Sequence, residues 1–470
     1  LFTAMANAIR SKNGGTDSIV ADTFPTEIRS LKTGFDYINH NVTEIKDYQF
    51  KNCTDLKSVD CYGLTSIGTG AFEGCTELET VVLYDGVQSV GENAFKGCSN
   101  TTIYCMFDEQ SEGWHENWNS DGCNVVYLGG AVKTWDTSAT ENDKVTAKLY
   151  NDINNDGYYK LIISGNGNMK NYSSKEIPWY NYQTNIKFAI IVDSVTNIGI
   201  NAFRNCKSLT SITIPNSVTS INQQAFSSCY SLTSIIIPDS VTIIDNNVFE
   251  YCKSLTSITI PNSVTGIGSS TFKGCTSLTY INIHDSVTII GRDAFEDTAY
   301  YNDSSNWTND VLYIGNYLLN VRWRISGDCT VKDGTTVIAR YAFNDCELLT
   351  SVNIPNSITS VSNSAFSYCY NLISITIPNS VISIDSYAFS SCKSITSINY
   401  IGTIAQWNSI TFSDYWNNDT GNYTIYCTDG TITKDDVKFQ NPENYIDICR
   451  HNHHAPQKDK SQHCEYLDEQ

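Results

Sequence analysis

The sequence predicts a repeat solenoid, a β-rich α/β fold built from stacked coils of about 23 residues. Three observations predict it. Phenylalanine recurs every 23 residues, cysteine follows it at the same period, and a proline marks one fixed point in most units. The regular phenylalanines are Phe203, Phe226, Phe249, Phe272, Phe295, Phe343, Phe366 and Phe389, and a shorter early series is Phe50, Phe72 and Phe95.

The residue pattern of each unit predicts one strand followed by turns, as in Ser208–Tyr230. Ile212 and Ile214 alternate with polar residues, which is typical of a strand with one buried face. Pro215 has no N–H group and ends the strand. Residues 223–229 predict a short helical turn that buries a phenylalanine and a cysteine. One unit buries too little apolar surface to fold alone, so the units must stack.

The pattern divides the chain into six segments. We expect a helical attachment segment at 1–34, a first short array with its closing cap at 35–128, a linker and hairpin-rich opening cap at 129–185, a main array at 186–400 with an irregular insertion at 297–329, a closing cap at 401–430, and a polar tail with His and Cys at 431–470.

The unit L-x-x-I-x-I-P-x-x-V-x-x-I-x-x-x-A-F-x-x-C resembles the BspA-type leucine-rich repeat, over about 36–128 and 186–400. The flanks at 154–180 and 400–430 are similar to segments that open and close such arrays. The resemblance implies a right-handed leucine-rich-repeat solenoid. It also implies a surface adhesin or interaction protein of bacteria, some protists or their phages, and not an enzyme.

The N-terminal segment Leu1–Leu31 has a helical pattern broken at Gly14 and Gly15. It resembles a short helical segment of tail and baseplate-associated proteins of phages that infect Gram-positive bacteria. This second resemblance implies an attachment element that binds other virion proteins.

Composition excludes several classes of protein. The chain has 30 Lys and Arg against 50 Asp and Glu, a net charge of −20, which disfavours nucleic acid as a partner. No stretch approaches the ~20 apolar residues of a membrane-spanning helix. No nucleophile elbow, zinc-protease motif or phosphate-binding loop occurs. We therefore expect no enzyme and no cofactor.

Ten of the 17 cysteines occupy the repeat position. Equivalent Cβ atoms of stacked coils lie about 4.8 Å apart, farther than the ~3.8 Å of a disulfide. The sequence therefore predicts a ladder of buried thiols. A pairing of Cys105 with Cys123 stays open as an alternative.

Two groups could hold a metal. Asp152, Asn154 and Asp156, followed by Gly157, match the opening of a calcium loop, but Ile163 stands where the bidentate Glu belongs. A hairpin turn explains the same residues. In the tail, Cys449, His451, His453, His463 and Cys464 suit zinc, although a polar tail without metal is the simpler interpretation.

The outward strand positions form columns of hydroxyl and amide side chains that could meet a protein or polysaccharide, and a solvated face is the alternative. The tryptophans could stack on sugars or seal the core, and the irregular stretch 297–327 is the first candidate for a specific contact. The candidate ligand-binding residues are Ser211, Thr213, Ser234, Ser257, Thr259, Tyr280, Asn282, Trp307 and Trp323.

These features favour a non-enzymatic recognition or structural protein. The leading hypothesis is a phage tail, baseplate or fibre component on the virion surface that contacts the host cell. The alternative is a cell-surface or secreted bacterial adhesin that binds a host protein or polysaccharide. A homo-oligomer is possible, but no heptad seam indicates one.

Overall fold

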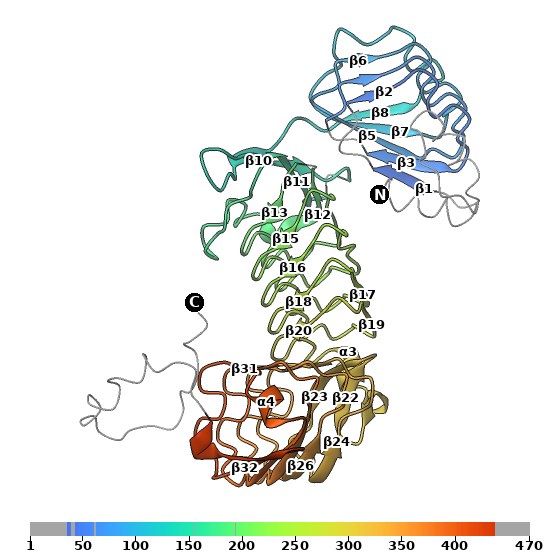
Figure 1. The fold of residues 1–470 in the computed structure, drawn as a ribbon. Helices are drawn as coiled ribbons and strands as arrows, with labels where there is room; N and C mark the ends of the chain where they lie inside the picture. Colours follow the sequence, from blue (N-terminus) through green and yellow to red (C-terminus); the bar gives the residue numbers. More distant parts are fainter. Residues whose placement is uncertain (1–34, 39–42, 61–62, 155, 193, 438–470) are drawn as a thin grey trace.

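The computed structural model describes residues 35–38, 43–60, 63–154, 156–192 and 194–437, which form two solenoid arrays joined in one chain (Figure 1). No helix among these residues has the length and apolar character needed to cross a bilayer. The predicted attachment segment at 1–34 lies outside the described residues, as do residues 438–470 of the tail predicted at 431–470. Residues 431–437 of that tail belong to the end of the second array.

The first array stacks parallel strands on two sides of a coil. Its long strands form one sheet in chain order, and its short strands form a second sheet. The long strands are β1 (Phe35–Ile38), β3 (Leu56–Asp60), β5 (Thr80–Tyr84), β7 (Thr102–Met106) and β8 (Asn124–Tyr127), and the short strands are β2 (Glu44–Ile45), β4 (Ser66–Ile67) and β6 (Ser89–Val90).

The second array opens with an antiparallel meander whose last strand starts the parallel stack. The meander and the next strands are β9 (Lys133–Asp136), β10 (Lys144–Asn151), β11 (Tyr159–Asn166), the 3₁₀ helix η2 (Gln183–Asn185), β12 (Ile186–Ile191) and β14 (Ser211–Thr213). The short-strand sheet is β13 (Asn197–Ile198), β15 (Ser220–Ile221), β16 (Ile243–Ile244), β18 (Gly266–Ile267) and β20 (Ile289–Ile290), and the long strands continue as β17 (Ser257–Ile260) and β19 (Tyr280–Ile283).

The coil between β14 and β17 differs from the prediction. Residues 233–238 form no strand, although Ile235 and Ile237 keep their buried positions. The apolar and polar alternation of residues 233–238 does not explain why this coil lacks a strand.

The predicted helical turn at residues 223–229 is also wrong. The segment consists of consecutive tight turns, with positive φ at Gln224 (56°) and Ser228 (63°). The N–H of Phe226 donates to the carbonyl of Val248 in the next coil (2.9 Å). Because such groups bond between coils, the i to i−4 bonds of an α-helix cannot form.

A modified coil, residues 297–326, interrupts the regular stack. It holds α3 (Ala299–Asn302), the 3₁₀ helix η3 (Ser304–Asn306), β21 (Trp307–Thr308), β22 (Val311–Ile314) and β23 (Tyr317–Val321). β21, β22 and β23 pair antiparallel, and β23 pairs in parallel with β25 (Val337–Ile338) of the following coil. Leu318 and Val321 are buried in the same core as the regular coils. The insertion therefore continues the solenoid.

The stacking direction changes at the modified coil. In Figure 1, β13 to β20 follow one another down the picture, whereas β24 to β32 follow one another across it. The last long-strand sheet is β24 (Gly327–Thr330), β26 (Leu349–Asn353), β28 (Ser374–Pro378), β30 (Ser397–Ile401), β32 (Thr424–Cys427) and the antiparallel β33 (Gly430–Thr433). The short strands are β27 (Ser360–Val361), β29 (Ser383–Ile384) and β31 (Thr411–Phe412), and the end is covered by α4 (Ile404–Trp407) and the 3₁₀ helix η4 (Lys434–Asp436).

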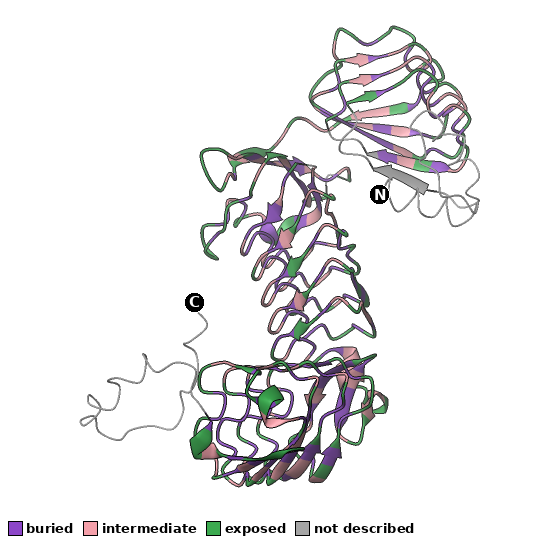
Figure 2. Cartoon of the chain, viewed as in Figure 1, coloured by how far each residue is buried: buried purple, intermediate pink, exposed green. Residues whose placement is uncertain are grey.

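The interior follows the sequence period closely (Figure 2). Phe226, Phe249 and Phe272 are fully buried, and neighbouring rings stack at 5.5 and 5.4 Å between centroids. Seven of the ladder thiols donate to a phenylalanine carbonyl of the preceding coil, as Cys229 does to Phe203 at 3.1 Å. Cys346, which follows the modified coil, donates instead to the carbonyl of Arg322. These contacts confirm the β-rich solenoid and the ladder of buried thiols.

Cys105 and Cys123 are separate thiols, so the alternative disulfide is not formed. Cys123 instead donates to the carbonyl of Cys98 at 3.2 Å, which extends the ladder into the cap of the first array.

The two arrays meet at a small buried contact, which we call the elbow. Outward residues of the first array, Val82, Tyr84 and Met106, pack against outward residues of the second, Tyr150, Ile162 and Ile190. The rings of Tyr84 and Tyr150 meet edge to face at 5.5 Å. Lys160 donates to the Tyr84 hydroxyl (3.2 Å), and Lys148 pairs with Asp85 (3.1 Å) at the rim.

Candidate functional site

The outward residues of the second array's long strands form in-register columns, which we call the polar face. Parallel pairing places Ser257 beside Tyr280 and Thr259 beside Asn282. After the modified coil, the register runs from Asp328 through Ser351, Ser374, Ser397 and Thr424. Because side chains of a strand alternate between faces, every member of a column points outward.

The structure brings together four of the predicted column residues: Ser257 and Thr259 on β17 pair with Tyr280 and Asn282 on β19. Ser211 and Thr213 on β14 lie instead beside Phe188 and Ile190 of β12. Ser234 is exposed but lies in the coil without a strand. Its neighbour Ile236 is 77% exposed and interrupts the polar column.

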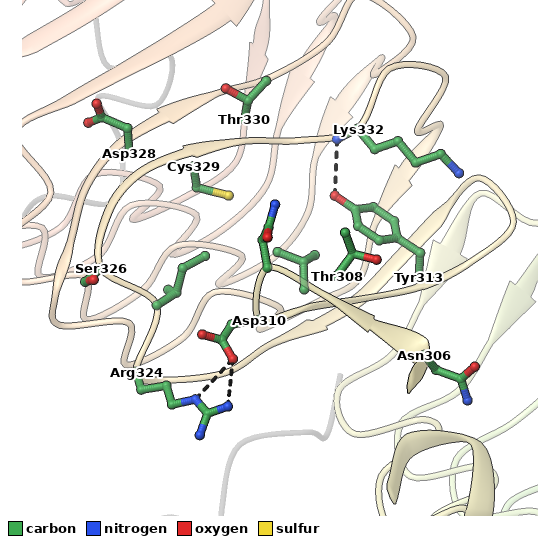
Figure 3. A pocket seen from close by; sticks show the side chains of 13 residues that line it. Asn306, Thr308, Asp310, Tyr313, Arg324, Ser326, Asp328, Cys329, Thr330 and Lys332 are labelled. Atoms are coloured by element: carbon green, nitrogen blue, oxygen red, sulfur yellow. Dashed lines mark hydrogen bonds and ion pairs between the residues drawn. The ribbon is translucent and has the colours of Figure 1, made fainter. Parts of the chain in front are cut away.

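A cleft of about 890 Å³ opens at the modified coil, between β21–β22 and the edge strand β24 (Figure 3). It separates β19 from β24, so it interrupts the polar face. Its lining comes from both sides of this gap: Asn306, Thr308, Asn309, Asp310, Val311, Tyr313, Arg324, Ile325, Ser326, Asp328, Cys329, Thr330 and Lys332.

A two-residue turn shapes one wall of the cleft. Asn309 and Asp310 both have positive φ (51° and 63°) and connect β21 to β22. Two such residues in sequence suit the type I′ turn that joins tightly twisted strands, and Asn and Asp tolerate this conformation. The turn presents the Asp310 carboxylate to two guanidinium groups, Arg324 at 3.0 Å and Arg322 at 3.5 Å.

Tyr313 and Lys332 form the other end of the cleft. The Tyr313 hydroxyl accepts from the backbone N–H of Lys332 at 3.2 Å, and the Lys332 ammonium lies 5.8 Å from the Tyr313 ring. Burial raises the pKa of Tyr313, so the phenol stays neutral. Burial also raises the pKa of the Cys329 thiol to about 11, which leaves it protonated and unreactive at neutral pH.

The two candidate tryptophans have different surroundings. Trp307 is half-buried, donates to the Tyr301 carbonyl at 2.7 Å, and carries the Arg322 guanidinium 4.3 Å from its ring centroid. It therefore braces the wall of the cleft. Trp323 is 72% exposed and precedes Arg324 in the chain, so its ring is available for contact with a ligand.

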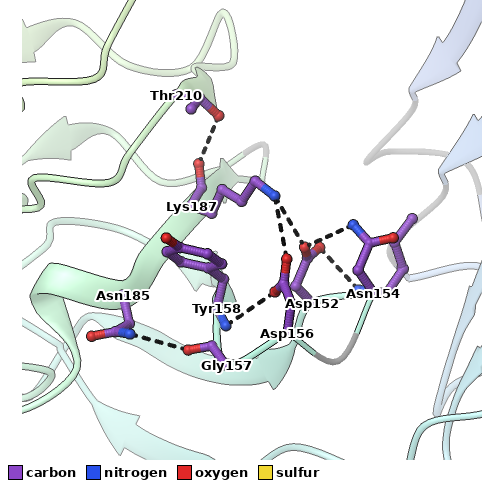
Figure 4. Close-up of polar contacts among 9 residues, drawn as sticks. Asp152, Asn154, Asp156, Gly157, Tyr158, Asn185, Lys187 and Thr210 are labelled. Atoms are coloured by element: carbon purple, nitrogen blue, oxygen red, sulfur yellow. Dashed lines mark hydrogen bonds and ion pairs between the residues drawn. The ribbon is translucent and has the colours of Figure 1, made fainter.

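The candidate calcium residues surround a lysine (Figure 4). The Lys187 ammonium lies 3.6 Å from Asp152 and 3.8 Å from Asp156, where it balances their charge. Asn154 donates to Asp152 at 3.4 Å. The residues belong to the loop of the β10–β11 hairpin, as the alternative interpretation predicted. Within the described ranges, no group of three His, Cys, Asp or Glu is arranged to hold a metal.

The candidate zinc residues Cys449, His451, His453, His463 and Cys464 lie outside the described residues.

Comparison with known families identifies the repeat. The family model for the BspA type leucine rich repeat region matches residues 29–112, 177–302 and 309–429, in six copies, which is more than half of the chain. This chain belongs to the BspA-type leucine-rich repeat family.

Solved structures of other repeat proteins resemble this BspA-type chain. A leucine-rich cell surface protein from Faecalibacterium prausnitzii is 26% identical, with a TM-score of 0.28, over 56% of this chain and 96% of that chain. A leucine-rich repeat protein from Bacteroides ovatus is 18% identical, with a TM-score of 0.31, over 83% and 92%. The pneumococcal vaccine antigen PcpA is 16% identical, with a TM-score of 0.28, over 61% and 82%. A search among curated proteins found no significant match.

The BspA-type repeat match is interrupted between residues 302 and 309. This gap contains η3 and β21, and two of its residues, Asn306 and Thr308, line the cleft. The gap thus contributes one edge of the cleft, and the rest of the lining lies in the matched range that begins at residue 309.

Sequence reasoning missed the far wall of the cleft. The candidate stretch ended at residue 327, whereas Asp328, Thr330 and Lys332 complete the lining. The alternation in β24 indicates that Asp328 and Thr330 point outward, but only the paired strands show that they face β21–β22.

Proposed function

We propose that this BspA-type protein is a non-enzymatic recognition or adhesion module that acts at a bacterial cell surface or after secretion. Its ligand is a cell-surface protein or polysaccharide, bound along the polar face and in the cleft. The observation that carries this proposal is the register of the polar columns on both sides of the cleft. A repeated row of donors and acceptors suits an extended ligand, because contacts worth only about 0.5–1.5 kcal/mol each can act together.

The more specific hypothesis of a phage virion component is supported by the sequence alone. It depends on Leu1–Leu31, which lies outside the described residues, and neither the family match nor the solved structures add support. The homo-oligomer likewise remains a hypothesis from the sequence. We therefore propose the bacterial surface role first.

A replacement experiment tests the proposed function. The full chain is applied to arrays of glycans, cell-wall fragments and host-surface proteins, beside a variant in which residues 297–327 are replaced by the regular unit 208–230. The matched control replaces the regular unit 231–253 with the same unit, which leaves the cleft intact. We expect at least tenfold weaker binding for the first variant and unchanged binding for the control.

Thermal unfolding of both variants verifies that they fold. Equal binding by both variants would remove the cleft from the proposal. Absence of binding by the unaltered chain to every surface on the arrays would overturn the recognition role itself.

A further inference from the structure

The cleft carries cations that the rest of the chain's composition does not predict. The sequence has a net charge of −20. Two cations, Arg324 and Lys332, line the cleft together with two carboxylates, Asp310 and Asp328, and Arg322 approaches Asp310 from outside the lining. The lining is thus neutral overall, in a protein whose net charge is strongly negative and whose overall field repels anions.

At one end of the cleft, a single carboxylate oxygen is shared by two guanidinium groups. Asp310 Oδ1 accepts from Arg324 Nε at 3.1 Å and lies 3.5 Å from Arg322. Arg324 has five N–H donors and its side chain is 57% exposed, so most of its donors remain open to a ligand. Asp310 fixes the position of the Arg324 guanidinium group but accepts hydrogen bonds from only part of its N–H donors.

At the opposite end, the Lys332 ammonium has no carboxylate partner among the described residues. It donates to the carbonyl of Gly315 at 3.3 Å, and its position beside the Tyr313 ring restricts its motion. A cation that is already ordered loses less side-chain entropy when a ligand binds. Figure 3 shows Arg324 and Lys332 at opposite ends of the cleft, with Thr308 between them.

The middle of the cleft is neutral and polar. Thr308, Asn309 and Thr330 offer hydroxyl and amide groups that can both donate and accept. The Asp328 carboxylate accepts from the Ser351 hydroxyl at 2.6 Å, so part of its capacity is satisfied on the polar face. Such a lining matches the hydroxyl groups of a sugar ring.

We infer that the cleft binds an acidic saccharide, a sugar chain that carries a carboxylate at the Lys332 end. This inference rests on the proposed function and names its ligand class. A carboxylate can form charge-assisted hydrogen bonds with the Lys332 ammonium, and the open donors of Arg324 can bind a further carboxylate of the same sugar chain. The cleft volume lies in the range of roughly 300–1,000 Å³ that is typical of small-ligand sites.

Trimers of galacturonate, mannuronate and guluronate, titrated calorimetrically against the full chain, test the inference. The same trimers with methyl-esterified carboxylates are the matched neutral probes, and a sulfated neutral trimer tests a different anion. We expect at least one acid trimer to bind tenfold or more tightly than its ester, with an affinity that falls as salt rises.

Three variants separate this inference from a structural effect. Lys332→Gln removes a cleft cation and should weaken binding of the acid trimer about tenfold without changing binding of the ester. Lys393→Gln is the matched control, because Lys393 is exposed and pairs with Asp419 far along the chain. Asp310→Asn removes a carboxylate that competes with the ligand and should tighten binding several-fold.

Each result of these titrations either supports or overturns the inference. Failure of every uronate trimer, equal binding of acid and ester, or an unchanged affinity in Lys332→Gln would overturn the inference. Tighter binding of the sulfated trimer would overturn the carboxylate assignment. If the cleft replacement abolishes binding to the surface arrays while no acid trimer binds, the ligand class is wrong and the recognition role stands.

Discussion

The two arrays share one coil geometry but differ on the outward face of their long strands. In the first array, Val82, Tyr84 and Met106 point outward and are buried in the elbow. In the second array, Ser257 and Thr259 occupy the outward positions of β17 and are exposed. Apolar outward residues thus occur where the arrays meet, three from the first array and three from the start of the second, and polar ones occur where the face stays open.

This difference separates the roles of the inward and outward residues. The inward residues make the coil and are nearly the same in both arrays. The outward residues decide whether the face binds the chain's own second array or stays open.

Tyr84→Ala should uncouple the arrays. Tyr84 is 1% exposed and contacts the second array through its ring and its hydroxyl. Removal of a buried aromatic ring costs about 3–5 kcal/mol in free energy of unfolding. Urea unfolding would measure this loss, and small-angle scattering should show a wider range of angles between the arrays.

Tyr280→Ala is the matched control for the open face. Tyr280 is 61% exposed on β19, and its removal should change stability by no more than about 0.5 kcal/mol. Equal losses for the two variants would contradict the proposed difference between the faces.

Alkaline pH should destabilise both arrays, because their interiors are alike. Burial raises the pKa of Cys105 in the first array and of Cys275 in the second from 9.0 to about 12. Between these values the folded state keeps protons that the unfolded chain loses. Stability is therefore complete below pH 9 and falls as the pH rises, by up to about 1.4 kcal/mol per pH unit for each such thiol.

Urea unfolding from pH 8 to 11 measures this slope. Cys105→Ala and Cys275→Ala should each reduce it by the contribution of one thiol. A slope that changes in only one of the two variants would show that the interiors differ after all.

Asp85→Asn should have the smallest effect. The carboxylate pairs with Lys148 at 3.1 Å on the rim of the elbow, where both side chains are partly exposed. Such pairs contribute about 0.2–1 kcal/mol, and the loss should disappear at high salt. A loss as large as that of Tyr84→Ala would mean that charge, and not apolar packing, holds the elbow.

The period of the sequence predicted the solenoid, the stacked phenylalanines and the thiol ladder, because each depends on residues one coil apart. It could not predict the elbow. Tyr84 and Val82 have the pattern of an ordinary buried strand, and their partners Tyr150, Ile162 and Ile190 lie far along the chain. The cleft was predicted only in part, since its far wall comes from the next coil.

The modified coil has a further consequence, for the way the chain unfolds. Phenylalanine rings stack without interruption from Phe203 to Phe295 and again from Phe343 to Phe389, but no ring of this series links Phe295 to Phe343. In a solenoid each coil is stabilised mainly by its neighbours. The buried core continues through the modified coil, but the interrupted ring stack makes this coil the expected boundary between two cooperative units. We therefore expect one run to melt before the other, with the boundary between them at the cleft.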